Sequence, residues 1–118
     1  MHSYSLVQTL TQACWDGSGK KCVEIGTLTG LSALYWLQML GGNGTLWSFE
    51  KSPEHFAHAE KNLKSYIEKK HCHLVLGDAL EKLPAIEDQG PFDFIFILKK
   101  YLFFFPISYL KISVFCKV

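Results

Sequence analysis

The sequence predicts an α/β fold in which a parallel β-sheet carries helices on both faces. Strand-like and helix-like segments alternate four times between residues 21 and 97, and the connections between them are short. This alternation indicates parallel strands joined by crossover helices. The expected strands are almost wholly apolar, which is typical of strands buried on both faces of a sheet.

Length and composition limit the number of domains, the kinds of partner and the cellular compartment that we expect. A chain of 118 residues holds one domain, and its net charge of +1 argues against a partner such as nucleic acid or a membrane surface. Its four cysteines (Cys14, Cys22, Cys72 and Cys116) form no CxxC pair, so we expect isolated thiols in a reducing compartment. The first residues lack a basic region followed by an apolar run, so we expect no signal peptide and a cytoplasmic protein.

The first half of the alternation is marked by glycines. An apolar stripe over residues 6–14 predicts a helix, and residues 21–25 predict a strand. The turn Gly26-Thr27-Leu28-Thr29-Gly30 then leads into residues 31–40, which are rich in helix formers. The run Gly41-Gly42-Asn43-Gly44 ends that helix.

The second half begins with a strand at residues 45–49 that closes on Glu50. Ser52-Pro53-Glu54 is a helix start, with a capping hydroxyl, a proline at the first helical position and an acid near the positive end of the dipole. That helix is expected to run to about Lys70. The remaining expected elements are a strand at 73–76, a helical turn that ends near Pro84, and a strand at 92–97.

Acidic residues and a glycine turn stand at three successive strand ends. In open parallel sheets, ligands bind beyond the carboxyl ends of the strands, so Glu24, Glu50 and Asp78 mark a candidate cofactor site. The turn from Gly26 to Gly30 lacks the third glycine of a GxGxxG fingerprint and carries no basic residue for a pyrophosphate. Glu24 would repel phosphates and favour an ammonium or sulfonium, which points to a cationic cofactor.

Each of these features also has a structural interpretation. The glycine turn can serve only the packing of helix on strand, because glycine removes the Cβ. Glu50 lies 26 residues after Glu24 and can accept hydrogen bonds from both hydroxyls of a ribose. A solvated acid that begins a helix is the alternative for Glu50. The glycine turn and Glu50, taken together, favour a cofactor site over these structural interpretations.

Four linked motifs resemble one known family. Residues 23–34, VEIGTLTGLSAL, are similar to the first motif of cation-dependent O-methyltransferases of the bacterial, caffeoyl-CoA and catechol type. The segments EKSPE (50–54), LGDAL (76–80) and PFDFIFI (91–97) follow in the order and spacing of that family. The resemblance covers roughly residues 6–97. It implies a Rossmann-like, class I methyltransferase fold with S-adenosylmethionine as the cofactor.

Carried over residue by residue, the resemblance implies a set of cofactor contacts. Gly26 and the backbone after it would face the methionine part, with Glu24 near the ammonium. Ser32 would meet the cofactor carboxylate near a helix N-terminus, where the dipole favours an anion. Glu50 would hold the ribose hydroxyls, and Asp78 would accept from the exocyclic amine of adenine. The implied set is Glu24, Gly26, Thr27, Leu28, Gly30, Ser32, Glu50, Asp78 and Ala79.

The resemblance stops after the fourth expected strand. Family members continue there with an aspartate that binds a divalent, Mg-type metal, whereas this chain has Leu98 and no acidic residue after Asp93. We therefore expect residues 1–97 to be the N-terminal, cofactor-binding half of a methyltransferase domain, truncated after its fourth strand. No metal ligand or catalytic residue is assigned here, and impaired or absent catalysis is expected.

Residues 98–118 form an atypical hydrophobic tail without Gly, Asp, Asn or Thr. One hypothesis is a frameshift near codon 98 of an A/T-rich gene, since all twelve basic residues are Lys. Another is a replacement edge strand, for example Ile112–Phe115. A membrane anchor is disfavoured because Pro106 and Lys111 interrupt a run shorter than the ~20 residues that span a bilayer.

Three functional readings follow. The first is an O-methyltransferase that acts on a hydroxyl of a small molecule, with no nucleic-acid or membrane partner; its relatives are often dimers, and the sequence leaves the oligomeric state open. The second is a non-catalytic S-adenosylmethionine-binding remnant. The third, an NAD-binding dehydrogenase fragment, is disfavoured by the missing GxGxxG. His71-Cys72-His73 is expected to be a strand start without a metal, and His55 and His58 to lie on a solvated face.

Overall fold

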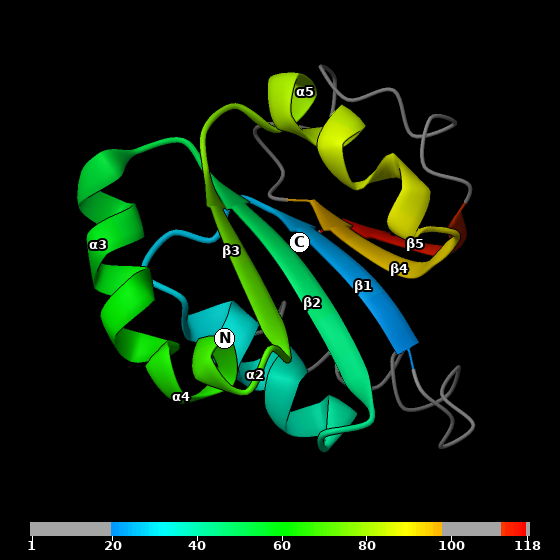
Figure 1. Cartoon of the computed structure of the whole chain (residues 1–118), viewed down its shortest axis with the longest axis horizontal. Helices are drawn as coiled ribbons and strands as arrows, with labels where there is room; N and C mark the ends of the chain where they lie inside the picture. The colour runs from blue at the N-terminus through cyan, green and yellow to red at the C-terminus, as the bar shows by residue number, and fades with distance from the viewer. Residues whose placement is uncertain (1–19, 98–111, 118) are drawn as a thin grey trace.

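The computed structural model describes residues 20–97 and 112–117, and these residues form a five-stranded parallel sheet with helices on both faces (Figure 1). The strands lie in the order β3-β2-β1-β4-β5. Their bounds are Lys20–Ile25 (β1), Gly44–Glu50 (β2), Cys72–Leu76 (β3), Phe92–Ile97 (β4) and Ile112–Lys117 (β5). The expected α/β fold is confirmed.

The helices follow the predicted alternation with two differences. Their bounds are Leu31–Leu40 (α2), Pro53–Asn62 (α3), Lys64–Glu68 (α4), Ala79–Lys82 (α5) and Leu83–Gln89 (η1, a 3-10 helix). The helix expected up to Lys70 is divided at the buried Leu63, whose φ of −103° and ψ of 8° depart from helical values. The turn expected to end near Pro84 instead continues as η1, because proline is tolerated in the first turn of a helix.

Two apolar layers hold the helices on the sheet. On one face, α2, α3 and α4 cover Cys22, Leu46 and Phe96. The Trp36 ring of α2 stacks on Phe96 at 4.0 Å between ring centroids, with 6° between the planes. On the other face, α5 and η1 cover a second cluster from the same strands, which includes Trp47. Trp36 and Trp47 therefore pack where helices meet the sheet, one on each face.

The tail contributes a strand. β5 pairs in parallel with β4, from Phe92 opposite Ile112 to Ile97 opposite Lys117. The hypothesis of an added edge strand at Ile112–Phe115 is thus confirmed. β5 pairs with the backbone groups on the side of β4 that faces away from β1, which would otherwise be an open edge. The expected helix over residues 6–14 lies outside the described residues. Across the described part of the chain, no helix has the length and apolarity that crossing a bilayer requires.

The sheet order creates a switch point between β1 and β4. From β1 the chain adds strands β2 and β3 on one side, and then crosses to add β4 on the other side. Register aligns the carboxyl ends: Ile25 lies opposite both Phe49 and Ile97, and Glu50 lies opposite Leu76. The residues that follow these strand ends are therefore brought to one edge, where ligands of such sheets bind.

Gly30 generates a stability prediction. It adopts a φ of +91°, and a Cβ added there would lie 3.2 Å from Leu63 Cγ and 3.4 Å from Ala59 Cα. We expect Gly30→Ala to lower the free energy of unfolding by about 2–4 kcal/mol through backbone strain and overpacking against α3. Urea unfolding followed by circular dichroism measures the change.

Gly41 provides the matched control. It ends the same helix with a φ of +59°, but a Cβ there would meet nothing within 4 Å. Gly41→Ala should therefore show backbone strain alone, about 1–2 kcal/mol. Equal losses for the two variants would contradict the close packing of α2 on α3.

Candidate functional site

The candidate site lies at the carboxyl ends of β1, β2 and β3, where the glycine turn, Glu50 and Asp78 meet the same edge of the sheet. The turn between β1 and α2 is bound to β2 at its start, because the backbone N–H groups of Gly26 and Thr27 both donate to the Phe49 carbonyl, at 2.9 and 3.1 Å. Gly77 donates to the Glu50 carbonyl at 2.8 Å. These bonds link the three strand ends directly.

The turn itself adopts a backbone that favours glycine. Gly26 and Gly30 have φ values of +96° and +91°, and Leu28 between them has a φ of +54°. A left-handed leucine costs about 1–2 kcal/mol, and here its N–H donates to Glu50 Oε1 at 2.6 Å. Asn62 of α3 donates to the Thr29 carbonyl at 2.8 Å and holds the end of the turn.

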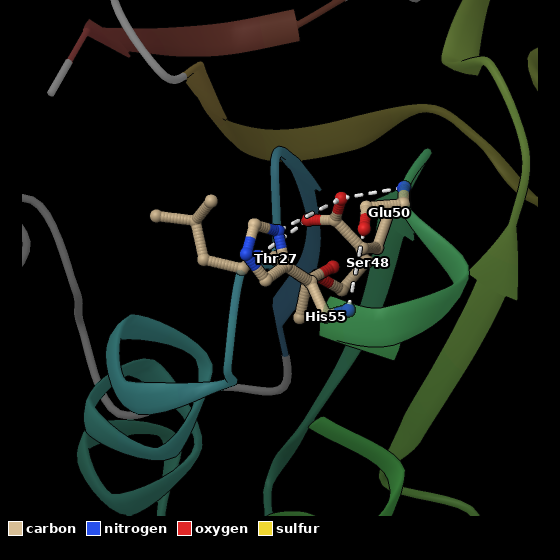
Figure 2. A network of polar contacts seen from close by, with 6 residues as sticks. Thr27, Ser48, Glu50 and His55 are labelled. Carbon is tan, nitrogen blue, oxygen red and sulfur yellow. Dashed lines mark hydrogen bonds and ion pairs between the residues drawn. The ribbon is translucent and has the colours of Figure 1, made fainter. Parts of the chain in front are cut away.

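Glu50 is a buried carboxylate at the end of β2, with only 2% of its surface exposed. Oε1 accepts from Leu28 N, and Oε2 accepts from Ser52 N at 2.9 Å. His55 Nδ1 lies 3.9 Å from Oε2. Figure 2 shows Thr27, Ser48, Glu50 and His55 gathered at this point, between the glycine turn and the start of α3. The alternative of a solvated acid that merely begins a helix is therefore wrong for Glu50.

Glu24 is buried to the same degree, on the face of the sheet that α2 covers. Its Oε2 accepts from Ser32 Oγ at 2.6 Å and from Trp36 Nε1 at 3.1 Å. Its Oε1 accepts from Ser48 Oγ at 2.6 Å. Ser48 in turn shares a hydrogen bond of 2.5 Å with Thr27 Oγ1, so a continuous chain of polar groups connects the turn, both strands and α2.

Burial governs the protonation of Glu24. Desolvation raises the pKa of this carboxyl from 4.5 to about 7, and the hydrogen bonds from Ser32, Ser48 and Trp36 lower it only in part. The negative charge of Glu50 adds to the increase. The site thus holds two buried carboxyl groups, of which one titrates near neutrality. Such an environment disfavours a bound phosphate and favours a cation.

Asp78 caps the short helix α5 beside the third strand end. Its Oδ1 accepts from Leu80 N at 2.9 Å, and its side chain is half-buried. Ala79 is buried against the second apolar layer. Hydrogen bonds thus connect Glu24 with Ser32 and, through Ser48, with Thr27. Another connects Leu28 with Glu50, and Gly26 and Gly30 lie in the same turn. Asp78 and Ala79 follow the neighbouring strand end, where Asp78 is hydrogen-bonded to Leu80 and Ala79 packs in the second apolar layer.

Sequence reasoning missed three participants. Ser48 and Trp36 are donors to Glu24, and His55 approaches Glu50 although a solvated face was expected for it. That expectation is right for the exposed His58, and the His55 side chain is also 45% exposed although it approaches Glu50. The register of a parallel pair could have found Ser48, since it lies opposite Glu24 and two residues before Glu50, on the same face of β2.

Other candidate groups remain apart from this site. Cys72 is buried and His73 is exposed against the Trp47 ring, as expected for a strand start. Burial, with a smaller contribution from Glu24, raises the pKa of the Cys72 thiol to about 12, so it is unreactive. Within residues 20–97 and 112–117, no group of three or more His, Cys, Asp or Glu side chains is close enough to hold a metal ion.

The sheet order, the glycine turn and the acids at successive strand ends define a Rossmann-like methyltransferase fold. The model of the O-methyltransferase family matches residues 11–110, and the chain belongs to that family. The match extends past the fourth strand, where the sequence motifs end.

Individual relatives agree with this assignment. A catechol O-methyltransferase of Niastella koreensis is 37% identical over 93 residues, which cover 77% of this chain and 41% of the relative. A catechol O-methyltransferase of Mycobacterium tuberculosis is 35% identical over 78 residues, which cover 66% of this chain and 35% of the relative. The chain thus spans about two fifths or less of the length of these relatives.

A solved structure gives the same fold. The O-methyltransferase from Bacillus cereus, determined in complex with S-adenosylhomocysteine (SAH), superimposes with a TM-score of 0.66 at 32% sequence identity. The superposition covers 80% of this chain and 42% of that protein.

The raised pKa of Glu24 predicts how stability depends on pH. The folded chain keeps a proton on Glu24 that the unfolded chain releases above pH 4.5, so this stabilisation is full below pH 4.5 and is lost as the pH rises through about 7. Relative to Glu24→Gln, the free energy of unfolding of the native chain should fall by about 3 kcal/mol between pH 4.5 and pH 8.

Urea unfolding at several pH values measures this difference. Glu54→Gln is the matched control, since Glu54 is exposed in the first turn of α3. Its pH profile should run parallel to that of the native chain. A parallel profile for Glu24→Gln as well would contradict the protonation of Glu24 in the fold.

Proposed function

We propose that this chain binds S-adenosylmethionine at the carboxyl edge of β1, β2 and β3, and that the whole protein transfers the cofactor's methyl group to a hydroxyl of a small molecule. When bound, S-adenosylmethionine supplies an electrophilic methyl group on a positively charged sulfonium. The observation that carries the proposal is the buried Glu50 carboxylate, which faces the glycine turn and keeps acceptor capacity for a ligand.

The acceptor count of Glu50 supports a ribose. An ionised carboxylate offers about four lone-pair sites. Two are used by the N–H groups of Leu28 and Ser52, which fix the orientation of the group. The remaining sites fit the two adjacent hydroxyls of a ribose. The Bacillus cereus relative was solved with SAH, and it supports an adenosyl ligand for this fold.

The other predicted contacts are proposed around this anchor. The backbone from Gly26 to Gly30 would face the methionine part, and Asp78 with Ala79 would flank the adenine. Asp78 Oδ1 already accepts from Leu80 N, so its exocyclic-amine contact is proposed for Oδ2. An ionised Glu24, which Ser48 and Thr27 connect to the turn, would favour the cationic end of the cofactor.

Ser32 is proposed to have two partners. Its hydroxyl donates to Glu24 in the structure, yet Ser32 is also the predicted contact of the cofactor carboxylate in the first turn of α2. A hydroxyl has a single hydrogen to donate, so the Ser32 hydroxyl would donate to the bound cofactor carboxylate in place of Glu24.

We propose that this chain by itself does not catalyse methyl transfer. The position at which the resemblance places a metal-binding aspartate carries Leu98, so no step through a metal is assigned to these residues. The methyl acceptor, a homodimer and a cytoplasmic, reducing location remain proposals for the whole protein. The unreactive thiol of Cys72 is compatible with the last of these.

Isothermal titration calorimetry with SAH tests the binding function. We expect saturable binding by the native chain, and a loss of about tenfold to hundredfold in affinity for Glu50→Gln, since hydrogen bonds to a charged group contribute about 1.5–3 kcal/mol. Glu54→Gln on the next helix is the matched control and should bind normally. A folded chain that prefers NAD to SAH would instead support the dinucleotide-binding alternative.

A methyl-transfer assay tests the second proposal. With a catechol as acceptor and labelled S-adenosylmethionine, the chain should form no methylated product above background, with or without added Mg²⁺. Binding of SAH measured in parallel shows whether the cofactor site is intact. Product formation that depends on Mg²⁺ would overturn the proposal that these residues alone are inactive.

A further inference from the structure

The segment after β2 places a histidine beside the proposed ribose anchor. Ser52 caps α3, and its Oγ accepts from the His55 N–H at 3.3 Å. The Ser52 N–H donates to Glu50 Oε2. One short turn therefore fixes the carboxylate of Glu50 and the first helical turn that carries the His55 imidazole. Figure 2 shows Glu50 and His55 within one polar cluster.

The distance between the two side chains leaves room for a third group. His55 Nδ1 lies 3.9 Å from Glu50 Oε2, which is too long for a direct hydrogen bond. A hydroxyl oxygen placed between them could stand about 2.8 Å from each atom, which is the usual length of such bonds. The carboxylate side chain is 3% exposed and the imidazole is 45% exposed, so the histidine lies on the solvent side of the anchor.

We propose that His55 is a specificity-determining residue that makes the site require a ribose hydroxyl. The hydroxyl would donate a hydrogen bond to Glu50 Oε2 and accept one from His55 Nδ1. This inference rests on the proposed adenosyl site and deepens it. A deoxyribose would lose both hydrogen bonds and leave the remaining acceptor site of the buried Glu50 Oε2 unfilled beside its bond from Ser52 N, which is a basis for rejecting such an analogue.

The chemistry of the imidazole suits this role. Nδ1 can donate in the neutral tautomer that carries its proton there, and also in the imidazolium form. The amide nitrogen of asparagine occupies nearly the same position relative to the backbone and also donates. His55→Asn is therefore expected to keep the contact, whereas His55→Ala removes it. His58 lies one turn further along α3 and is exposed, so it provides a matched histidine control.

Calorimetric titration with SAH and with its 2′-deoxy and 3′-deoxy analogues tests the inference. The native chain should bind SAH at least tenfold more tightly than one of the two analogues. His55→Ala should weaken SAH binding about tenfold, as expected for one lost hydrogen bond, and should leave the affinity for that analogue unchanged. His55→Asn should restore the preference, and His58→Ala should behave as the native chain.

The outcomes separate this inference from the proposed function. If the native chain binds SAH and His55→Ala binds it as tightly as His58→Ala does, the role of His55 is overturned while the adenosyl site stands. Equal weakening of SAH and both deoxy analogues by His55→Ala would show a merely structural role, and would overturn it too. Failure of the folded native chain to bind SAH would overturn both proposals.

Discussion

The buried carboxyl group of Glu24 is the constraint on which the rest of this site depends. A carboxyl group without solvent is costly unless it is protonated or hydrogen-bonded. Here its donors come from α2, through Ser32 and Trp36, and from β2, through Ser48. The group therefore fixes the position of the helix over the first two strands, and the turn between β1 and α2 has to connect elements that are already in place.

The strain in that turn follows from this constraint. The chain has to leave β1, cross the end of β2 and enter α2 within a few residues, and it does so with positive φ values at Gly26, Leu28 and Gly30. Glu50 stabilises the least favourable of these by accepting from Leu28 N. The two buried carboxyl groups thus have separate tasks. Glu24 organises the scaffold beneath the turn, and Glu50 fixes the turn itself and faces the proposed ligand.

Much of the fold was predictable from the sequence because its signals are local. The apolar strands, the glycines at 41–44 and the Ser52-Pro53 helix start each specify an element without reference to the rest of the chain. The helix at Leu31–Leu40 was predicted with its observed bounds. The division at Leu63 was not, because the hydrogen bonds from Leu63 N to Ala59 O and from Ile67 N to Leu63 O persist across it, and the sequence there has no breaker.

The candidate site was predictable in its strand-end acids and not in their surroundings. Glu24, Glu50 and Asp78 follow from the rule that ligands of parallel sheets bind at carboxyl ends. The partners of these acids depend on the pairing register and on helix placement, which periodicity does not specify. The pairing of Ser48 with Glu24 needed the β1–β2 register. The approach of His55 to Glu50 needed the angle at which α3 leaves β2.

The central claim is that a ligand binds at this edge of the sheet and is held by its backbone as well as by Glu50. A titration of the ¹⁵N-labelled chain with SAH, followed by nuclear magnetic resonance, tests it most directly. The account predicts that amide shifts concentrate at residues 26–30, 50–52 and 77–79, with Leu28 and Ser52 among the largest. Shifts concentrated instead at the opposite edge, near Gly41–Gly44 and His71, would contradict it.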